Sequence, residues 1–328
     1  MIELLGLPFM QRALIAALLS GLIAPAIGTF IVQRKMSLLG DGLGHVAIAG
    51  VGLAMMTGWA PLPVAVITCV AGAVAVELLR QNGKASGDLG LAILFYGGLA
   101  TGVLMAGVAG QGAAGLSSFL FGSLTSVSEG DVILIVVLAV LILALTIGLA
   151  PRLFAISVDE NYSRVLGIKV KTLNLLVVVL AAVTVTISMR TVGLLLISAL
   201  MVIPVATAQQ SFVGFTASFF GAMGIGALAA VGGTIGSFYL DTATGATIVV
   251  TAIVLLALSW LLGRWLRRPD RFIPYVEDHG QHPHEPAENH DDSHAHHPGV
   301  RVIQHGDHLD YVHDGHRHAR HGDHYDEH

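Results

Sequence analysis

Long apolar stretches occupy most of the first 270 residues, and short polar breaks separate them. A helix that crosses a bilayer needs about 20 mostly apolar residues, with ~17 as a lower bound. Nine stretches meet this requirement, although the second is short and rich in glycine. They lie at residues 13–33, 43–59, 61–79, 89–109, 131–150, 172–189, 191–209, 211–231 and 245–263. The pattern predicts an all-α polytopic membrane protein, a bundle of eight or nine transmembrane helices.

The composition agrees with a membrane protein. Hydrophobic residues make up 54% of the chain and charged residues 12%, whereas about 25% of an ordinary soluble domain is charged. The first apolar stretch follows a single base, Arg12, and is too long for the core of a signal peptide, so we expect it to be the first span. The single cysteine, Cys69, excludes an intrachain disulfide and argues against a thiol-based metal site.

Basic residues between the stretches set the expected orientation, because Lys and Arg are enriched in cytoplasmic loops. Nine spans, with the N-terminus outside and the C-terminal tail in the cytoplasm, place all the main basic groups on the cytoplasmic side. These groups are Arg34–Lys35, Arg80 with Lys84, the four bases between 152 and 171, and the four bases between 264 and 271.

Charge and histidine content change abruptly near residue 275. Before Val276, 14 Lys and Arg residues stand against 10 Asp and Glu residues; from Val276 onward, 3 stand against 12. The same last segment holds 15 of the 16 histidines. We therefore expect a transmembrane domain at 1–275 and a cytoplasmic His/Asp-rich tail at 276–328. The tail has so little apolar content that we expect it to be disordered without metal.

Asp41 and His45 are the candidate metal ligands of the transmembrane domain. Four residues apart on a helix, they lie on one face, and ionisable residues within a membrane usually mark a path or cavity. A carboxylate oxygen and an imidazole nitrogen suit Zn²⁺, and also Mn²⁺ or Fe²⁺. Two ligands are too few for storage but suit a site that binds and releases an ion. The alternative is a helix-capping Asp with a structural His at the interface.

The polar loop at 151–171 predicts a short helix of its own. Ser157 and Glu160 fit a capping box at its start, and Gly167 fits the residue that follows a helix end. Three apolar residues on this helix either pack back on the bundle or contact a partner, and the residues alone leave both alternatives open. They are Tyr162, Val165 and Leu166.

A histidine–aspartate repeat recurs every eight residues in the tail, as HGDH at 305–308, HDGH at 313–316 and HGDH at 321–324. Histidines three residues apart with intervening Asp supply nitrogen and oxygen ligands, and such tracts are typical of metal binding. The candidates for low-affinity or buffering sites are His305, His308, His313, His316, His321 and His324. The alternative is a solvated acidic tail without a ligand.

Two further features bear on mechanism. The sequence contains no G-x-x-x-x-G-K-[ST] motif and no H-E-x-x-H motif, so we expect neither P-loop ATP hydrolysis nor metalloprotease activity from this chain. These absences lead us to expect that the chain is not an enzyme. Pro204 removes a backbone donor within an apolar stretch, which predicts either a simple kink or a helix break that lines a transport path.

Several motifs, in order along the chain, resemble the zinc/manganese family of ABC-transporter permeases, the membrane subunits of bacterial divalent-metal importers. They are RKMSLLGDGLGHVAIAGVGLA at 34–54, DLGLAILFYGGLATGV at 88–103, SFLFGSLTSVS at 118–128, VDENYSRVLGI at 158–168 and TVGLLLISALMVIPVATA at 191–208. The resemblance covers roughly residues 7–270 and leaves the His-rich tail outside.

The resemblance implies that Asp41 and His45 contact the transported ion. It also implies that residues 157–167 form the cytoplasmic coupling helix, which favours contact with a partner over packing on the bundle. The residues that match this coupling motif are Ser157, Asp159, Glu160 and Gly167.

The expected partners follow from the same resemblance. They are a second permease copy, a cytoplasmic ATP-binding subunit, an extracytoplasmic metal-binding protein and the lipid of a bacterial inner membrane, with no nucleic acid. We expect no permanently bound cofactor; the cargo is Zn²⁺, which the imidazoles of the tail favour, or else Mn²⁺ or Fe²⁺. The alternative functions are a gradient-driven secondary transporter and a membrane-anchored metal sensor that uses the tail.

Overall fold

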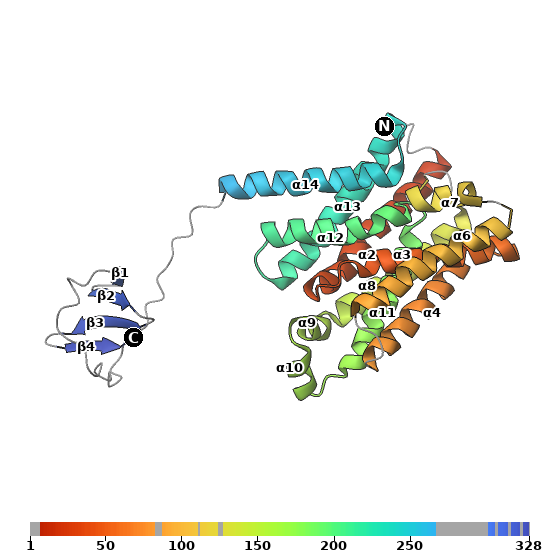
Figure 1. Ribbon diagram of the computed structural model, residues 1–328. Coiled ribbons are helices and arrows are strands. Elements are labelled where there is room, and N and C mark those ends of the chain that lie inside the picture. The colour runs from red at the N-terminus through yellow and green to blue at the C-terminus, as the bar shows by residue number, and fades with distance from the viewer. Residues whose placement is uncertain are drawn as a thin grey trace. The chain divides into compact units, whose positions relative to one another are not determined.

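The computed structural model describes residues 7–82, 87–110, 112–123, 127–266, 301–305, 308–313, 316–321 and 324–327. The chain divides into two units, Met1–Trp265 and Leu266–His328. The described part of the first unit is helical, and the described part of the second holds four strands (Figure 1).

The helices follow the apolar stretches of the sequence closely. In chain order they are α2 (Pro8–Gln33), α3 (Leu39–Thr57), α4 (Pro61–Gln81), α5 (Gly87–Ala92), the π-helical turn η1 (Ile93–Gly97), α6 (Gly98–Val108), α7 (Gly112–Phe121), α8 (Glu129–Gly148), α9 (Ala150–Val158), α10 (Glu160–Val165), α11 (Val170–Ser188), α12 (Leu194–Ser211), α13 (Phe215–Leu240) and α14 (Thr244–Leu266).

Seven helices in the described part of the chain are long and apolar enough to cross a membrane, namely α2, α3, α4, α8, α11, α13 and α14. Two shorter apolar helical segments, Ile93–Val108 and Leu196–Ser211, coincide with the two remaining predicted stretches. The prediction of an all-α protein with many spans is confirmed. The number of spans, eight or nine, stays a prediction.

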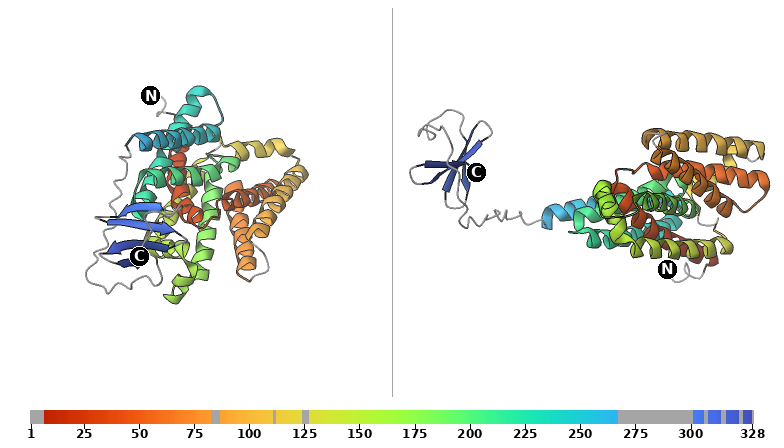
Figure 2. Two further views of the ribbon diagram at one scale, coloured as in Figure 1. Left: turned by 60° about the vertical axis from the view of Figure 1, so that its left-hand side comes forward. Right: turned by 90° about the horizontal axis from the view of Figure 1, so that it is seen from below.

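Two long helices organise the bundle. α2 packs against α8, α11, α12 and α13, while α3 packs against α4, α6, α11 and α12, and two further views show the same helices crossing one another (Figure 2). In the most apolar 18-residue window of each helix, 78% of the residues are buried in α3, but only 28% in α8 and 28% in α14. The helix that carries Asp41 and His45 is therefore enclosed by protein, and α8 and α14 present most of their surface outward.

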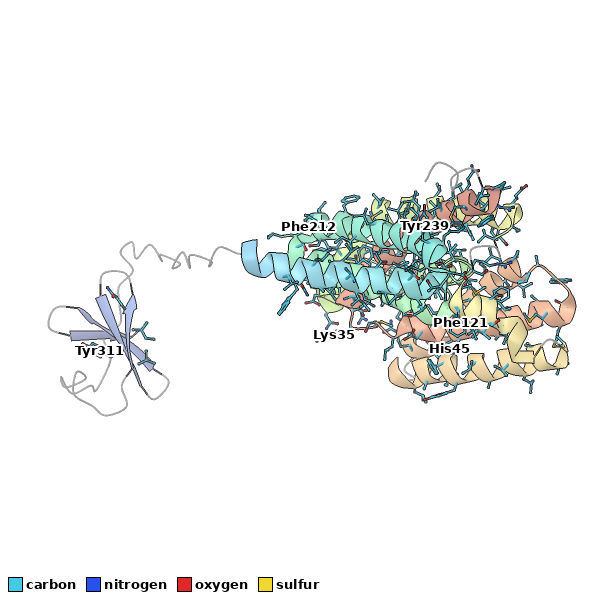
Figure 3. The ribbon with its side chains drawn as sticks, turned by 90° about the horizontal axis from the view of Figure 1, so that it is seen from above. Lys35, His45, Phe121, Phe212, Tyr239 and Tyr311 are labelled. Atoms are coloured by element: carbon cyan, nitrogen blue, oxygen red, sulfur yellow. The ribbon has the colours of Figure 1, made fainter. Side chains whose placement is uncertain are left out.

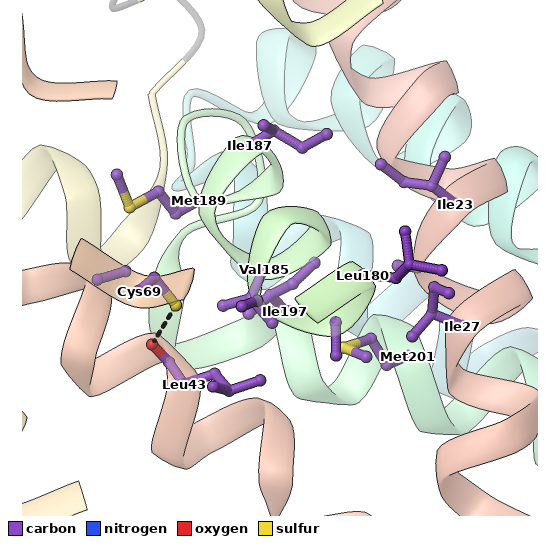
Figure 4. Packing of buried hydrophobic residues seen from close by; sticks show 14 of the residues in the cluster. Ile23, Ile27, Leu43, Cys69, Leu180, Val185, Ile187, Met189, Ile197 and Met201 are labelled. Atoms are coloured by element: carbon purple, nitrogen blue, oxygen red, sulfur yellow. Dashed lines mark hydrogen bonds between the residues drawn. The ribbon is translucent and has the colours of Figure 1, made fainter. Parts of the chain in front are cut away.

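The core of the bundle is one large apolar cluster with buried residues from α2, α3, α4, α8, α11, α12, α13 and other helices. Ile23 and Ile27 of α2 contribute to it together with Leu180 of α11 and Met201 of α12 (Figure 4). On its other side the Cys69 thiol donates a hydrogen bond to the carbonyl oxygen of Leu43, at 3.2 Å. Cys69 is thus a buried packing residue that ties α4 to α3.

The described strands of the second unit form an antiparallel meander in the order β1-β2-β3-β4. They are β1 (Arg301–His305), β2 (His308–His313), β3 (His316–His321) and β4 (His324–Glu327). The expected disorder of the tail without metal stays a prediction, because residues 276–300 lie outside the described part of the chain. A Gly and an Asp stand between consecutive strands in the sequence, a composition typical of two-residue hairpin loops.

Candidate functional site

Asp41 lies in the first turn of α3, and His45 follows one turn later. The N-cap of α3 is Leu38, so the alternative of a capping Asp41 is wrong. A carboxylate in the first helical turn is nevertheless favourable, because it faces the positive end of the helix dipole. Before α3 the chain turns sharply at Lys35, whose φ of 57° is in the left-handed region.

The His45 ring is held in one orientation. Its Nδ1 lies 2.7 Å from the carbonyl oxygen of Asp41, and the ring centroid lies 3.9 Å from that of Phe95 in η1. A carbonyl oxygen can only accept, so Nδ1 must carry the proton in this hydrogen bond. Whenever the ring is neutral, Nε2 keeps a lone pair, the arrangement in which metal-binding histidines donate their other N–H to a carbonyl. His45, labelled in Figure 3, is only 6% exposed.

The carboxylate of Asp41 is half-buried, and within the described part of the chain it forms no hydrogen bond or ion pair. An acid held in this way has oxygens available for another ligand. With His45 Nε2, it gives one carboxylate and one imidazole on adjacent turns of an enclosed helix. No group of three or more His, Cys, Asp and Glu forms among the residues whose side chains are described. Among the described side chains, no third residue of these types joins Asp41 and His45, and their role as a two-ligand site stays a prediction.

Glycines let the neighbouring helices approach α3 beside this pair. A Cβ on Gly98 of α6 would lie 2.6 Å from the carbonyl carbon of His45, and one on Gly102 would lie 2.5 Å from a methyl carbon of Ile48. Such contacts are closer than real Cβ atoms make, so α6 can reach the His45 backbone only because these residues are glycines.

Ser198 of α12 is a buried polar residue near the pair that the sequence did not reveal. A Cβ on Gly40, the residue before Asp41, would lie 2.7 Å from Ser198 Oγ and 3.4 Å from Met201 Sδ. Ser198 Oγ is buried and finds no hydrogen-bond partner among the described residues. A single serine in an apolar stretch carries no sequence signal for such a position.

Pro204 does not break α12, which runs continuously from Leu194 to Ser211. Of the two alternatives for this proline, the helix break is therefore wrong, and a simple kink stays a prediction. A role for Pro204 in lining a path stays a prediction.

The short helix predicted within 157–167 is present as α10, but its cap differs from the prediction. Asp159 is the N-cap, and its Oδ1 accepts from the backbone N–H groups of Asn161 and Tyr162 at 2.8 and 2.9 Å. Ser157 belongs to α9, where its hydroxyl donates to the carbonyl of Leu153. Aspartate is as good a cap as serine, and it displaced the expected capping box. Gly167 follows the C-cap with φ of 77°, as predicted.

The apolar side chains of this segment point away from the bundle. Tyr162 is 61% exposed, Val165 84% and Leu166 57%. The alternative that they pack back on the bundle is therefore wrong for this chain by itself. An exposed apolar patch of this kind usually marks an interaction site.

A buried polar network joins α10 to the end of α2. Oε1 of Glu160 accepts from Nη2 of Arg34 at 3.1 Å and from Nδ2 of Asn174 in α11 at 2.9 Å, and Arg34 also donates to Oδ1 of Asn174. The Arg34 side chain is 7% exposed, and burial lowers its pKa from the ordinary value while the charge of Glu160 opposes the shift. The guanidinium remains protonated at neutral pH, so Glu160 balances a buried cation.

Comparisons with known proteins agree with this architecture. Residues 6–263 match the protein family described as the ABC 3 transport family. The chain is 33% identical over 259 residues to the manganese transport system membrane protein MntC of Halalkalibacterium halodurans, covering 79% of this chain and 88% of the relative. It is 32% identical to the high-affinity zinc uptake system membrane protein ZnuB of Haemophilus influenzae, covering 75% and 95%.

A solved structure shows a similar fold. PsaBC from Streptococcus pneumoniae in complex with Fab superposes with a TM-score of 0.71 at 30% identity, and the match covers 79% of this chain and 94% of that one.

Proposed function

The chain belongs to the ABC 3 transport family, and from that premise we propose that it is the membrane permease subunit of an ATP-driven divalent-metal importer. The observation that carries the proposal is the pair on α3. Asp41 offers a carboxylate that pairs with no described residue, and His45 offers Nε2 on a ring fixed by its Nδ1 hydrogen bond. Both lie on the most enclosed of the candidate spans. Relatives named for manganese and zinc transport support a metal cargo.

In this proposal, Asp41 and His45 form a two-ligand stepping site for the ion. Two protein ligands hold a cation less firmly than the four of a structural zinc site, and weak binding permits release to the other side. We propose Zn²⁺ as the principal cargo because imidazole favours zinc over manganese. The identities of 33% and 32% to a manganese and a zinc relative do not choose between the two; Mn²⁺ and Fe²⁺ are the alternatives.

Energy would enter through α10. Its exposed Tyr162, Val165 and Leu166 provide an apolar surface for a cytoplasmic ATP-binding subunit. Movement of α10 would reach the metal site through Glu160 and Arg34, since Arg34 directly precedes the turn that leads into α3. The remaining partners are an extracytoplasmic metal-binding protein and a second permease copy.

The distribution of charged contacts supports an orientation with α10 in the cytoplasm. Arg34 binds Glu160, and the side chain of Gln81 donates to the carbonyl of Lys171. Three of the four predicted cytoplasmic basic groups thus meet at one end of the bundle. On this orientation in the inner membrane, the N-terminus lies outside and the C-terminal tail lies inside.

Reconstitution into liposomes tests the proposal. Uptake of radioactive zinc is measured with the chain alone, and with the chain plus its ATP-binding subunit, metal-binding protein and ATP. The proposal expects uptake only in the complete system. Uptake by the chain alone, driven by a gradient, would instead show a secondary transporter. A chain that takes up no zinc but produces a zinc-dependent signal would favour a sensor.

A further inference from the structure

The register of the tail strands brings the repeated histidines together in pairs. Where one strand gives way to the next, two histidines stand directly opposite each other: His305 with His308, His313 with His316, and His321 with His324. All six belong to the HGDH and HDGH repeats. The repeat and the strand pairing therefore coincide, so every repeat is one connection flanked by a cross-strand histidine pair.

A third residue of a ligating type shares a face with each pair. Residues two apart on a strand lie on the same face, about 6.8 Å apart, and directly opposed residues have Cβ atoms about 4.5–5.5 Å apart. Two residues after the second histidine of each pair stand Asp310, His318 and Asp326. The three sets are His305/His308/Asp310, His313/His316/His318 and His321/His324/Asp326.

We propose that each set of three is a binding site for one divalent cation of the zinc class. Two imidazoles with a carboxylate, or three imidazoles, form a ligand set that zinc accepts. Three protein ligands leave a fourth coordination position open, as in zinc sites that exchange a ligand. The tail thus carries three separate, exchangeable sites in place of one diffuse histidine-rich tract. That the bound ion is also the transported cargo rests on the proposed function; the binding itself does not.

The distinguishing feature of these sites is register and not composition. Seven further histidines lie between 276 and 300, outside the described residues, and any histidine-rich segment binds some zinc. Exchanging His308 with its neighbour Leu309 keeps the composition but moves the histidine to a position on the opposite face of β2 from the one that pairs with His305. A tract that binds by composition would not respond to this exchange.

Equilibrium zinc binding to the purified full-length chain tests the proposal. The Asp41→Ala/His45→Ala background removes the transmembrane pair. In that background, the exchange variant His308→Leu/Leu309→His is expected to bind one zinc ion fewer per chain when the tightest class of sites is saturated. The matched control exchanges Ser293 with His294, which lie outside the described residues, and is expected to bind as many ions as the background. Equal zinc binding by the two exchange variants would overturn the proposal.

A milder variant guards against loss of the strands. Asp310→Asn leaves the backbone pairing unchanged and removes one anionic ligand, so zinc affinity at one site is expected to fall by about tenfold or more. No change in any binding constant would count against the third ligand of the set. Zinc uptake by the same variants is assayed separately, so loss of transport with intact tail binding contradicts only the proposed function.

Discussion

The helical bundle and the tail strands present metal-binding residue types in two different ways. The bundle offers one carboxylate and one imidazole on α3, in positions fixed by close packing against glycines of α6. The tail offers three sets of three ligating residues, in positions fixed by backbone register. Few ligands in a rigid frame suit passage of an ion, whereas more ligands on short strands suit holding it. The family match ends at residue 263 and covers only the first arrangement.

Among substitutions outside the Asp41–His45 pair, the largest expected effect comes from the exposed face of α10, the proposed contact with the ATP-binding subunit. Val165→Asp places a charge in the proposed contact with the ATP-binding subunit. We expect affinity for that subunit to fall by at least about tenfold, because an unpaired charge in an apolar contact is costly. Co-purification and zinc uptake measure the effect.

Leu240→Asp is the matched control for this substitution. Leu240 is also exposed. It is the last residue of the 26-residue α13, whose first residue, Phe215, contacts Phe154 of α9, so it lies at the end of α13 that is far from α9. Equal loss of the subunit in both variants would show that α10 is not the contact surface.

The next effect concerns the contact between Glu160 of α10 and Arg34, which precedes the turn into α3. Glu160→Gln leaves the buried Arg34 uncompensated, and Arg34→Met removes the shorter of the two ion pairs of Glu160. A double-mutant cycle should give a coupling energy of about 0.5–3 kcal/mol. Thermal unfolding in detergent and zinc uptake are the measurements. Arg164, which meets the same Glu160 at 3.5 Å in an exposed position, is the control, with an expected coupling of about 0.3–0.5 kcal/mol. If the effects of the Arg34 and Glu160 substitutions are simply additive, the two side chains are not energetically coupled.

A smaller effect separates two adjacent glycines. Gly98→Ala should destabilise the protein by about 1–3 kcal/mol, because the added methyl would meet the His45 backbone. A Cβ on Gly97 would meet nothing within 4 Å, so Gly97→Ala should be neutral or slightly stabilising. Thermal unfolding compares the two. If both variants unfold at the same temperature, the close approach of α6 to α3 does not determine the site.

The smallest effect on transport is expected from the tail. A chain that ends before Val276 should take up zinc at saturating concentration as fast as the full chain, because the family match lies entirely before that point. Zinc bound per chain at equilibrium should fall at the same time. Loss of saturated uptake would show that the two regions do not act separately.

The sequence predicted what depends on long apolar runs and on local signals. All nine apolar stretches contain a helix, and Gly167 occupies its predicted position after α10. It did not predict features that depend on tertiary contacts. The Arg34–Glu160 network joins residues 126 positions apart, and Ser198 approaches Gly40 only through helix packing.

Two predictions failed for identifiable reasons. Asp159 caps α10 in place of Ser157, because its carboxylate reaches two backbone donors of α10. At Pro204, where a helix break was one of two expectations, α12 continues without a break.

The most direct test of the central claim is the initial rate of zinc uptake by the complete reconstituted transporter with His45→Ala or Asp41→Ala. We expect each change to lower uptake by about 100-fold or more, since losing a direct ligand should exceed the ~10–100-fold cost of losing a supporting one. Asp241→Asn, which removes a carboxylate at the exposed end of α13, should leave uptake unchanged. Uptake by the His45 and Asp41 variants at the rate of the unmodified chain would contradict the assignment of a metal site on α3.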